Sequence, residues 1–411
     1  MFKKVWHDWW IGIFILLIFI GIFSGRSLVI GFGVMGLLVA GISWVWNELS
    51  LRELNYKRIM SQNRIFKGES VSLTIELSNM KPIPLSRIDI DDDIPEDLEI
   101  AGTELLYSPN PKTMKMRHST SLSWYEKVRW EYRLTGTKRG YFKLGPSSIT
   151  SGDVFGLFDC FERRDSDDYV LVYPTVVSLP NIGLPELRPL GEVENGIRMF
   201  HDPSRPSGIR DYQDGDPMKT IDWKSTARST TLKVRTFEPS SSHTVILIVA
   251  IETALRFWEG YSVANLERII TAASSIASYC ADKGYSIGLF SNGTPILSDR
   301  PMDVPASSSV DQLMIILEVL ATIRPLPMGS MTENLSTSSK TFPAGSTLVI
   351  TAALMTDDFV GIITRLHHMG YKIVVLYVAD DSCPLLPEGV LLYEIGSHFE
   401  SMEQRGEFVS R

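Results

Sequence analysis

Hydrophobic and polar positions divide the chain into stretches with different periods. The first fifty residues hold two long apolar runs, WWIGIFILLIFIGIFS (9–24) and SLVIGFGVMGLLVAGISWVW (27–46), separated by little more than Gly25 and Arg26. The first run is a little shorter than the ~20 residues that usually span a bilayer, and the second meets that length. A signal peptide is the alternative for the first run, but a second apolar run follows at once and no small-residue cleavage site precedes it. We therefore predict two transmembrane helices over residues 1–50.

The charges around these two runs predict their orientation. Basic residues flank the pair on its outer sides, whereas the short turn between the runs holds only Arg26. The flanking residues are Lys3, Lys4, Arg52, Lys57 and Arg58. Because positively charged flanks stay in the cytoplasm, both ends of the pair and everything after residue 50 are expected there. We predict a multi-pass protein of the cell membrane with two helices and with its N- and C-termini in the cytoplasm.

The second stretch, residues 51–178, shows the period of β-strands. Val71, Leu73, Ile75 and Leu77 alternate with polar residues, which is typical of a strand buried on one face. Three further short strands are expected at SRIDID (86–91), KVRWEYRL (127–134) and DYVLVYP (168–174). Turns rich in proline, glycine and asparagine separate them. We predict a β-sandwich for this region.

Residues 179–239 begin as a proline-rich segment, which predicts an extended connector. Its prolines include Pro180, Pro185, Pro189, Pro203 and Pro206. The connector then carries the stretch RDYQDGDPMKTIDWKSTAR (210–228), in which four aspartates, two lysines and two arginines surround a single tryptophan. Any chemistry of this connector is therefore expected within this stretch.

After residue 239 the pattern changes again. HTVILIVAI (243–251) is a continuous apolar run rich in β-branched residues, which suits a strand buried on both faces. Further strands at YSIGLF (285–290), STLVIT (346–351) and KIVVLYV (372–378) alternate with helices expected near 262–283, 309–323 and 357–369. This alternation predicts a parallel, doubly wound α/β domain over residues 240–400, followed by a tail at 401–411.

Such sheets bind ligands at the carboxyl ends of their strands, here in the loops after Ile251, Phe290 and Thr351. The first loop reads AIETALRF and contains neither GxGxxG nor GxxxxGK[ST], which excludes the usual dinucleotide and nucleotide sites. Asp357 and Asp358 are expected to begin the following helix, because carboxylates suit the positive end of its dipole. No Ser-His-Asp or Cys-His set stands out. We expect no cofactor and no catalysis.

Composition narrows the classes of function further. Of the 411 residues, 44% are hydrophobic and 21% are charged, which is the balance of a folded protein of two or three domains. The net charge of −8 opposes nucleic-acid binding, because that function needs a concentrated basic face. Cys160, Cys280 and Cys383 lie far apart, with no CxxC pair and no zinc spacing, and fit a reducing compartment.

The charged stretch at 210–228 first suggests a metal site. Asp211, Asp214 and Asp216 resemble a calcium loop, but Gln213 takes the third ligand position and the terminal acid is missing. Divalent-metal binding through this pattern is therefore the weaker interpretation.

A second interpretation is hydrolysis. The segment IDWK places Asp222 two residues before Lys224 on one face of an extended strand, as in nucleases that pair a carboxylate with a lysine near a scissile phosphate. Together with Asp214 and Asp216, these residues are the basis of an alternative function, a metal-dependent hydrolase. An acidic chain held at a membrane is nevertheless a poor nuclease.

A third interpretation is recognition, supported by the strong turn at residues 214–217, which includes Gly215. Trp223 with Arg228 and Arg235 has the composition of an interface hot spot, and both arginines offer forked donors for carboxylates. The same residues also suit an internal salt-bridge network that clamps the two soluble domains together. Docking surface and clamp both remain open.

Residues 208–239, GIRDYQDGDPMKTIDWKSTARSTTLKVRTFEP, resemble the defining motif of a bacterial family, domain of unknown function fifty-eight. In that motif an R-x-Y-x-x-GD element leads into IDWK-x-(S/T)-AR and a basic strand ending in FE. The matching residues are Arg210, Tyr212, Gly215, Asp216, Ile221, Asp222, Trp223, Lys224, Ala227, Arg228, Phe237 and Glu238. The upstream segments RGYFKLGP (139–146), DVFGLF (153–158) and VYP (172–174) also follow the family's order.

This resemblance implies a membrane-anchored, cytoplasm-facing protein with a von Willebrand factor A-like domain at its C-terminus. It implies a partner, a MoxR-type AAA+ ATPase encoded beside it, and often a transglutaminase-like membrane protein. The implied role is that of an adaptor of the ATPase in the maturation or envelope-linked remodelling of other proteins.

One departure from that resemblance concerns metal binding. A von Willebrand A domain that binds Mg²⁺ uses D-x-S-x-S after its first strand, because a hard cation needs a carboxylate and hydroxyls. Here Ala250, Glu252 and Ala254 occupy the three ligand positions, so Glu252 is the one oxygen donor left. Ala352 and Ala353 replace the usual acid after a later strand. We therefore expect a degenerate site that binds no metal.

Overall fold

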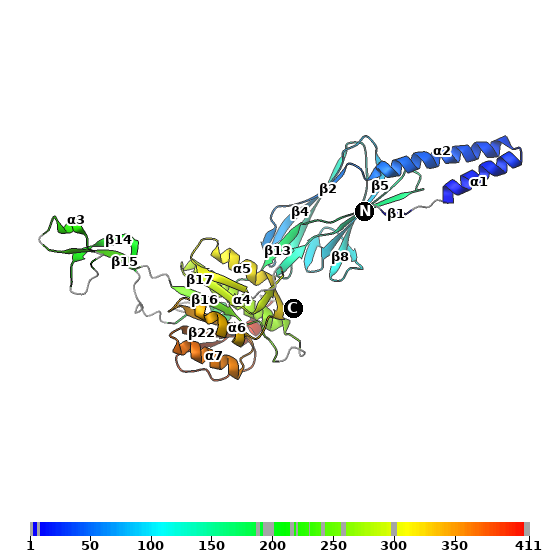
Figure 1. Ribbon diagram of the computed structural model, residues 1–411. Helices are drawn as coiled ribbons and strands as arrows, with labels where there is room; N and C mark the ends of the chain where they lie inside the picture. The colour runs from blue at the N-terminus through cyan, green and yellow to red at the C-terminus, as the bar shows by residue number, and fades with distance from the viewer. Residues whose placement is uncertain are drawn as a thin grey trace. The chain divides into compact units, whose positions relative to one another are not determined.

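The computed structural model describes residues 3–5, 9–185, 190–191, 201–213, 218, 221–229, 231–239, 243–255, 260–296 and 302–406. For residues 3–10, 201–208 and 235–239 it describes at most the backbone. The chain divides into two units, Met1–Pro174 and Thr175–Arg411. The first holds apolar helices and a strand-rich body, and the second holds an α/β region (Figure 1), so the chain is multidomain as predicted.

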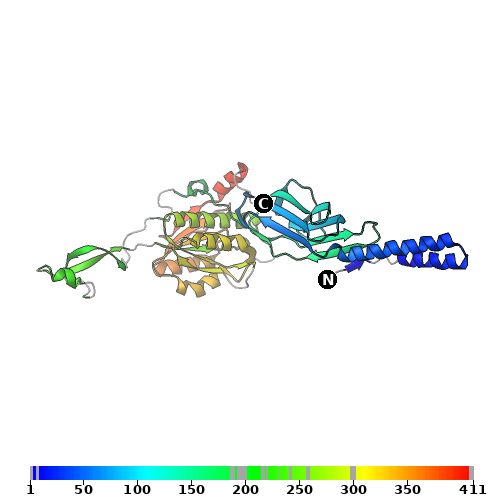
Figure 2. The ribbon, with the colours of Figure 1, turned by 90° about the horizontal axis from the view of Figure 1, so that it is seen from above.

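Two helices near the start of the first unit, α1 (Trp9–Phe23) and α2 (Ser27–Ser50), lie side by side in both ribbon views (Figures 1 and 2). Their close approach needs glycine, because a Cβ at Gly36 would overlap the ring of Phe14. Among the described helices, α2 alone is long and apolar enough to cross a membrane, with a mean hydropathy of 2.2 over its most apolar window. A second crossing and the orientation stay predictions.

The strand-rich body consists of two larger sheets and one small one. The first sheet contains β1 (Lys3–Val5), β12 (Asp159–Arg164), β11 (Ser147–Gly152), β5 (Leu85–Pro95), β8 (Thr113–Leu122) and β7 (Leu105–Tyr107) in that order. The second contains β2 (Leu54–Met60), β4 (Ser70–Asn79), β9 (Lys127–Gly136) and β6 (Leu98–Ala101). The small sheet contains β10 (Gly140–Lys143), β13 (Tyr169–Tyr173) and β3 (Arg64–Phe66).

The core of this body lies between the two larger sheets. The four apolar residues that predicted a half-buried strand all lie in β4 and are buried, which confirms the period-two pattern. Ile75 of β4 packs in the same part of the body as Ile94 of β5 and Met116 of β8, which belong to the other sheet. Two sheets that share one core in this way have the arrangement of a β-sandwich.

The second unit is built on a six-stranded sheet. Its order is β19 (Met302–Ser307), β17 (Ser286–Ser291), β16 (Thr244–Val249), β21 (Thr347–Ala352), β22 (Lys372–Tyr377) and β23 (Leu391–Glu394). All neighbours are parallel except β19, which pairs antiparallel with β17. The order reverses between β16 and β21, which is the mark of a doubly wound sheet.

Helices and short elements complete this unit. The helices are α4 (Val263–Asp282), α5 (Gln312–Thr322), α6 (Met331–Ser338), α7 (Asp357–His368) and α8 (Gly396–Gln404). In the described residues, the 3-10 turns η1 (Leu179–Ile182) and η4 (Ser339–Thr341) and a small sheet of β18 (Gly293–Pro295) and β20 (Ile323–Pro327) accompany them. The structure confirms the predicted strands β16, β17, β21 and β22 and the helices α4, α5 and α7. Asp357 and Asp358 begin α7, as expected.

The first part of the predicted connector packs against the α/β core. Leu179, Ile182, Leu184 and Leu190 are buried in the same cluster as the strands of the large sheet. Ser274 of α4 also donates its hydroxyl to the carbonyl of Thr175, at 2.7 Å. The proline spacing therefore marks a break in regular structure, but the apolar residues between the prolines belong to the core.

Candidate functional site

The charged stretch of the family motif lies within a strand pair. β14 (His201–Asp211) pairs antiparallel with β15 (Lys233–Pro239), and the register shifts twice between His201 and Gly208. In the described part of the connection between the strands, the chain forms the short helix α3 (Trp223–Thr226). We call this part, residues 201–239, the motif hairpin.

Asp222 begins the helical turn of the motif hairpin. Its carboxylate Oδ1 accepts a hydrogen bond from the backbone N–H of Ser225 at 3.0 Å, which is the geometry of a helix N-cap. Its own backbone N–H donates to the carbonyl of Lys233 at 2.9 Å. The prediction that Asp222 and Lys224 share one face of an extended strand is therefore wrong. The chain turns at the buried Asp222, and Lys224 lies exposed in α3.

Asp211, at the end of β14, is also engaged within the hairpin. Its Oδ1 lies 2.7 Å from Nζ of Lys233 and accepts a hydrogen bond from the hydroxyl of Thr231 at 2.9 Å. These two contacts, and the charge of Lys233, lower the pKa of Asp211. The backbone carbonyl of Asp211 accepts from Arg210 at 3.0 Å. Asp211 thus holds the two strands together at the point where the charged stretch begins.

The described apolar side chains of the motif hairpin are mostly exposed. Ile221 and Val234 form an isolated bridge, and both side chains are buried. By contrast, Trp223 is 64% exposed, and Ile209, Met218 and Leu232 are exposed as well. A two-stranded unit is at best marginally stable alone, and an exposed apolar group of this kind marks a contact surface. The hairpin therefore offers a surface for another part of this chain or for another protein.

The remaining predicted motif residues are placed only in part. Tyr212 is half-buried, and its backbone N–H donates to the carbonyl of Leu232 at 2.9 Å. Arg228 is exposed just after α3. Asp214, Gly215 and Asp216 lie outside the described residues, and Arg235 and Glu238 lie in β15 with side chains that are likewise outside them. Within the described part of the chain, no group of three His, Cys, Asp or Glu residues is arranged to hold a metal ion.

The switch point of the large sheet, between the ends of β16 and β21, is the second place where chemistry was expected. Ala250 is buried, and Glu252 accepts a hydrogen bond at Oε1 from the backbone N–H of Met331, the first residue of α6, at 3.2 Å. Asn292, fully buried, accepts one from the N–H of Ile251 at 3.2 Å. Burial raises the pKa of Glu252, and the N–H of Met331 opposes that shift in part. The one predicted oxygen donor thus binds the start of a helix.

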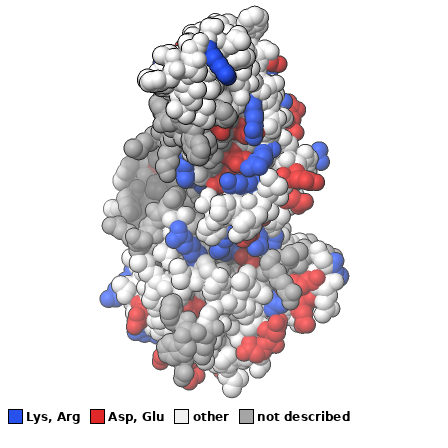
Figure 3. Space-filling view, turned by 90° about the vertical axis from the view of Figure 1, so that its right-hand side faces the viewer, with Lys and Arg blue, Asp and Glu red and all other residues white. Residues whose placement is uncertain are grey.

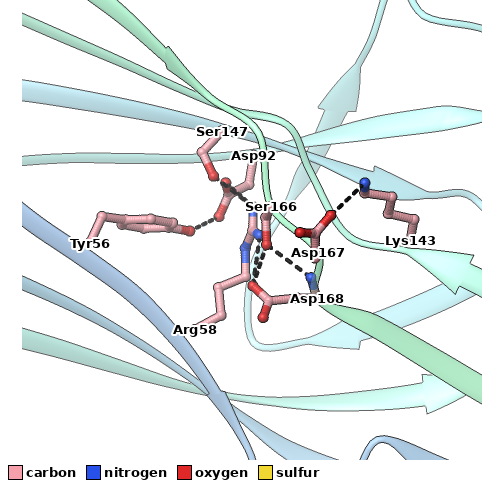
Figure 4. A network of polar contacts seen from close by, with 8 residues as sticks. All are labelled: Tyr56, Arg58, Asp92, Lys143, Ser147, Ser166, Asp167 and Asp168. Atoms are coloured by element: carbon pink, nitrogen blue, oxygen red, sulfur yellow. Dashed lines mark hydrogen bonds and ion pairs between the residues drawn. The ribbon is translucent and has the colours of Figure 1, made fainter.

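A buried polar network in the sandwich was not predicted (Figure 4). Arg58 of β2 donates through Nη2 to Asp92 of β5 at 2.8 Å and to the hydroxyl of Ser147 of β11 at 2.6 Å. Tyr56 donates its hydroxyl to the other oxygen of Asp92, and Asp168 accepts from Nη1 of Arg58 at 3.2 Å. The network therefore joins the two larger sheets.

Burial and charge act on this network together. The side chains of Arg58 and Asp92 are 1% and 0% exposed. Burial alone would lower the pKa of Arg58, but the carboxylate of Asp92 raises it on balance, and burial next to Asp92 raises the pKa of Tyr56. Both terminal nitrogens of Arg58 have partners in the network, while its buried Nε has none among the described residues, and this arrangement suits a structural pair that fixes the sheets. The only sequence signal was the spacing of Tyr56 and Arg58, two residues apart in a strand.

A family comparison covers most of the motif hairpin and most of the α/β region. The family model described as Protein of unknown function DUF58 matches residues 208–392, from within β14 to within β23, and confirms the predicted resemblance. A relative from Bacillus subtilis (strain 168), "Uncharacterized protein YeaD", is 25% identical over 243 residues. That alignment covers 59% of this chain and 57% of the relative, so the chain matches little more than half of that protein's length.

Solved structures show only weak likeness. An aerotolerance-related membrane protein from Bacteroides fragilis is 12% identical and covers 39% of this chain and 97% of its own, with a TM-score of 0.25. A cohesin module from Clostridium perfringens is 9% identical and covers 29% of this chain and 96% of its own, with a TM-score of 0.22. Likeness of this degree does not establish a shared fold.

Proposed function

We propose that this chain is a membrane-tethered, cytoplasm-facing interaction protein, without catalytic activity, whose motif hairpin docks onto a MoxR-type AAA+ ATPase. The ATPase then acts on other proteins in maturation or envelope-linked remodelling, with a transglutaminase-like membrane protein as a possible second partner. The observation that carries the proposal is the exposure of Trp223 on a two-stranded unit in which only two of the described apolar side chains, Ile221 and Val234, are buried.

The side chains around Trp223 support docking over chemistry. Lys224 and Arg228 are exposed beside it, and apolar Met218 and Leu232 are exposed on the same hairpin. An exposed tryptophan that shares a small unit with exposed cations and apolar groups has the usual composition of an interface centre. Such a surface fits a partner that offers carboxylates and an apolar pocket.

The metal-dependent hydrolase has less support. It requires carboxylates that are free to face a metal or a phosphate, yet Asp222 caps α3 and Asp211 binds Lys233. Lys224, its proposed partner, lies in the helical turn that Asp222 caps. Both described aspartates of the stretch therefore have structural partners within the hairpin.

The membrane tether rests on the two N-terminal helices. α2 has the length and hydropathy of a membrane-crossing helix, and α1 packs along it. With the basic flanking residues, this pair suits a transmembrane hairpin that leaves both termini in the cytoplasm. The partner ATPase would then meet the motif hairpin on the cytoplasmic side.

The α/β region suits a von Willebrand factor A-like domain without its metal. Its strand order, with β19 as the antiparallel edge, is that of a doubly wound sheet, and its switch point is where such a domain would bind a cation. Glu252 is occupied there by the N–H of Met331, and alanines fill the neighbouring ligand positions. We propose that this domain serves as scaffold and partner surface.

Capture from native membranes tests the docking proposal. Full-length protein and its Trp223→Ala variant are used as baits, and the recovered AAA+ ATPase is quantified by mass spectrometry. Truncation of a hot-spot tryptophan costs about 2 kcal/mol or more of binding free energy. The apparent affinity for the ATPase should therefore fall roughly 30-fold, and less ATPase should be recovered. Leu385→Ala, at an almost fully exposed leucine of the same unit, is the matched control and should recover the ATPase like the unaltered protein.

Equal recovery by the Trp223→Ala variant and the control would reject the docking surface. If the Trp223→Ala variant recovered the ATPase normally but had a lower midpoint of thermal unfolding, the clamp between the soluble domains would replace the docking surface as the interpretation. Recovery of no AAA+ ATPase by the unaltered protein would reject the proposed partner.

A further inference from the structure

Three loops lie at the end of the strand-rich body from which α2 leaves. β2 begins three residues after the cap of α2, and its first residue, Leu54, pairs with Asn79 at the end of β4. Ser78 pairs with Lys127 at the start of β9, which places the loops 80–84 and 123–126 together. Ser86 donates to the carbonyl of Asp153 at 3.4 Å, which adds the loop 153–158. The three loops therefore share one end of the body, next to α2.

The tips of these loops carry large apolar side chains. Between 56% and 68% of the surface of each is exposed. They are Met80, Trp124, Tyr125, Val154 and Phe155. Single exposed apolar residues are normal on a soluble protein, but a cluster on adjoining loops marks a binding surface.

Local structure holds these side chains outward. Tyr125 adopts a φ of +53°, a conformation that aromatic residues rarely take, and its N–H donates to the carbonyl of Lys81 at 3.3 Å. In the third loop, the carboxylate of Asp153 accepts from the N–H groups of Phe155 at 3.0 Å and Phe158 at 2.8 Å. A backbone that is strained in this way and fixed by hydrogen bonds is typical of a functional surface.

The junction between α2 and the body is itself fixed. Lys81 is buried, and its ammonium donates to the carbonyl of Ser50, the last residue of α2, and to that of Arg52 at 2.6 Å. Burial lowers the pKa of Lys81 to about 8, and the charge of Glu53 opposes this shift. α2 also contacts β11 and β12, the two strands that the third loop joins. The position of the loops along the axis of α2 is therefore fixed, beside the last turns of this helix, which carry the exposed Trp44.

From this geometry we infer that this end of the body is a lipid-binding surface, which rests on the proposed membrane tether. Trp124, Tyr125 and Phe155 enter the interface of the bilayer that α2 crosses, and Met80 and Val154 contact the acyl chains beside them. Trp and Tyr favour this depth because their rings are apolar and their N–H and O–H groups stay wet.

Continuity favours a lipid surface over a protein partner. The helix pair, at the top of Figure 3, presents a surface almost free of charged side chains, and the loops adjoin its inner end. Insertion would set the tilt of the strand-rich body on the membrane. The surface thus acts as a second anchor that orients this body.

Lipid-quenching measurements on the full chain in phospholipid nanodiscs test this inference. Single cysteines carrying an environment-sensitive fluorophore are placed at Trp124→Cys and Phe155→Cys in a Cys383→Ser background, because Cys160 and Cys280 are buried. The quencher is a phospholipid with a nitroxide near the carbonyl end of its acyl chain. The fluorescence of both labels should be quenched by the nitroxide lipid. Their emission maxima should also lie at shorter wavelength than those of the same labels on the chain unfolded in urea without detergent.

Two further labels are controls. Tyr107→Cys carries the label on an exposed aromatic position at the opposite end of the body, since Tyr107 pairs with Met114 at the far end of β8 from Leu122. It should not be quenched by lipid. Leu38→Cys places the label on the exposed side of α2 and reports whether that helix is embedded. Thermal unfolding of each labelled variant confirms that it keeps its fold.

The outcomes separate the inference from the tether. Quenching at residue 38 without quenching at residues 124 and 155 would overturn the lipid surface and leave the tether intact. No quenching at residue 38 would overturn the tether and the inference that rests on it. Labels at 124 and 155 that are shielded from an aqueous quencher yet untouched by the lipid quencher would overturn the inference in favour of a protein partner.

Discussion

The sandwich network and the motif hairpin both gather charged residues, but they differ in burial. Arg58 and Asp92 are 1% and 0% exposed and bind each other at 2.8 Å between two sheets. Lys233 and Asp211 also lie 2.7 Å apart, yet their side chains are 28% and 67% exposed. The distances are alike, so the difference in environment decides what each pair does.

That difference shows that a dense run of charges in a sequence is a poor guide to chemistry. A buried pair cannot lose one partner without leaving an uncompensated charge in a low dielectric, whereas water compensates an exposed one. Lys224 and Arg228 of the motif hairpin are exposed to solvent, whereas the charges of the sandwich network serve the fold. The feature that distinguishes the motif hairpin from the sandwich network is therefore the exposed Trp223 and not a carboxylate.

The largest expected effect is on the buried pair. Asp92→Ala leaves Arg58 without its main counter-charge and should lower the free energy of unfolding of the first unit by about 3–5 kcal/mol. Asp211→Ala is the matched change at the exposed pair and should leave the stability of the second unit unchanged within error. Urea unfolding of the full chain, with hydrogen exchange in β4 reporting on the first unit, measures both. Equal effects of the two variants would remove the distinction between the regions.

A smaller effect is expected at the cap of α3. Asp222→Ala removes the acceptor of the Ser225 N–H and should cost about 1 kcal/mol locally, whereas Asp222→Asn keeps an acceptor and should cost little. Hydrogen exchange of the Ser225 amide, together with ATPase capture, measures the change. If Asp222→Asn lost capture as fully as Asp222→Ala, the charge itself would be needed, and the hydrolase interpretation would gain ground.

The smallest effect is expected at Glu252, which is partly buried at the switch point of the large sheet. Because burial raises its pKa above the ordinary 4.5, the fold favours the protonated carboxyl, and this contribution to stability is lost as pH rises through the raised pKa. Glu252→Gln should therefore match the unaltered protein at pH values below the ordinary pKa and melt at a higher temperature near neutral pH. Thermal scans across this pH range test it, and a constant difference at all pH values would contradict it.

Local patterns sufficed for most of the fold. Alternation at β4 and the continuous apolar run of β16 gave their strands with nearly correct ends, because burial of one face or of both leaves a local period in the sequence. The elements that were missed have no such period. β19 contains a proline and an aspartate, and α6 is only eight residues long.

The candidate site was located by sequence and shaped by the tertiary structure. The motif and its matching residues were recognisable in the sequence, but the hydrogen-bond partner of each carboxylate was not. Asp222 binds an amide only three residues away, yet it begins a helical turn and not the extended strand that the sequence around it predicted. Glu252 binds a helix that begins almost eighty residues later, at Met331.

By itself the sequence determined the apolar helices, the strand and helix periods, the absence of an intact metal motif and the family resemblance, because each of these depends on residues near one another in the chain. Only the tertiary structure decided which polar groups meet. Arg58 and Asp92 come from different sheets. The buried Arg268 of α4 forms ion pairs with Asp380, which follows β22, and with Glu403 of α8. Strand pairing and helix packing set such contacts, and no local period records them.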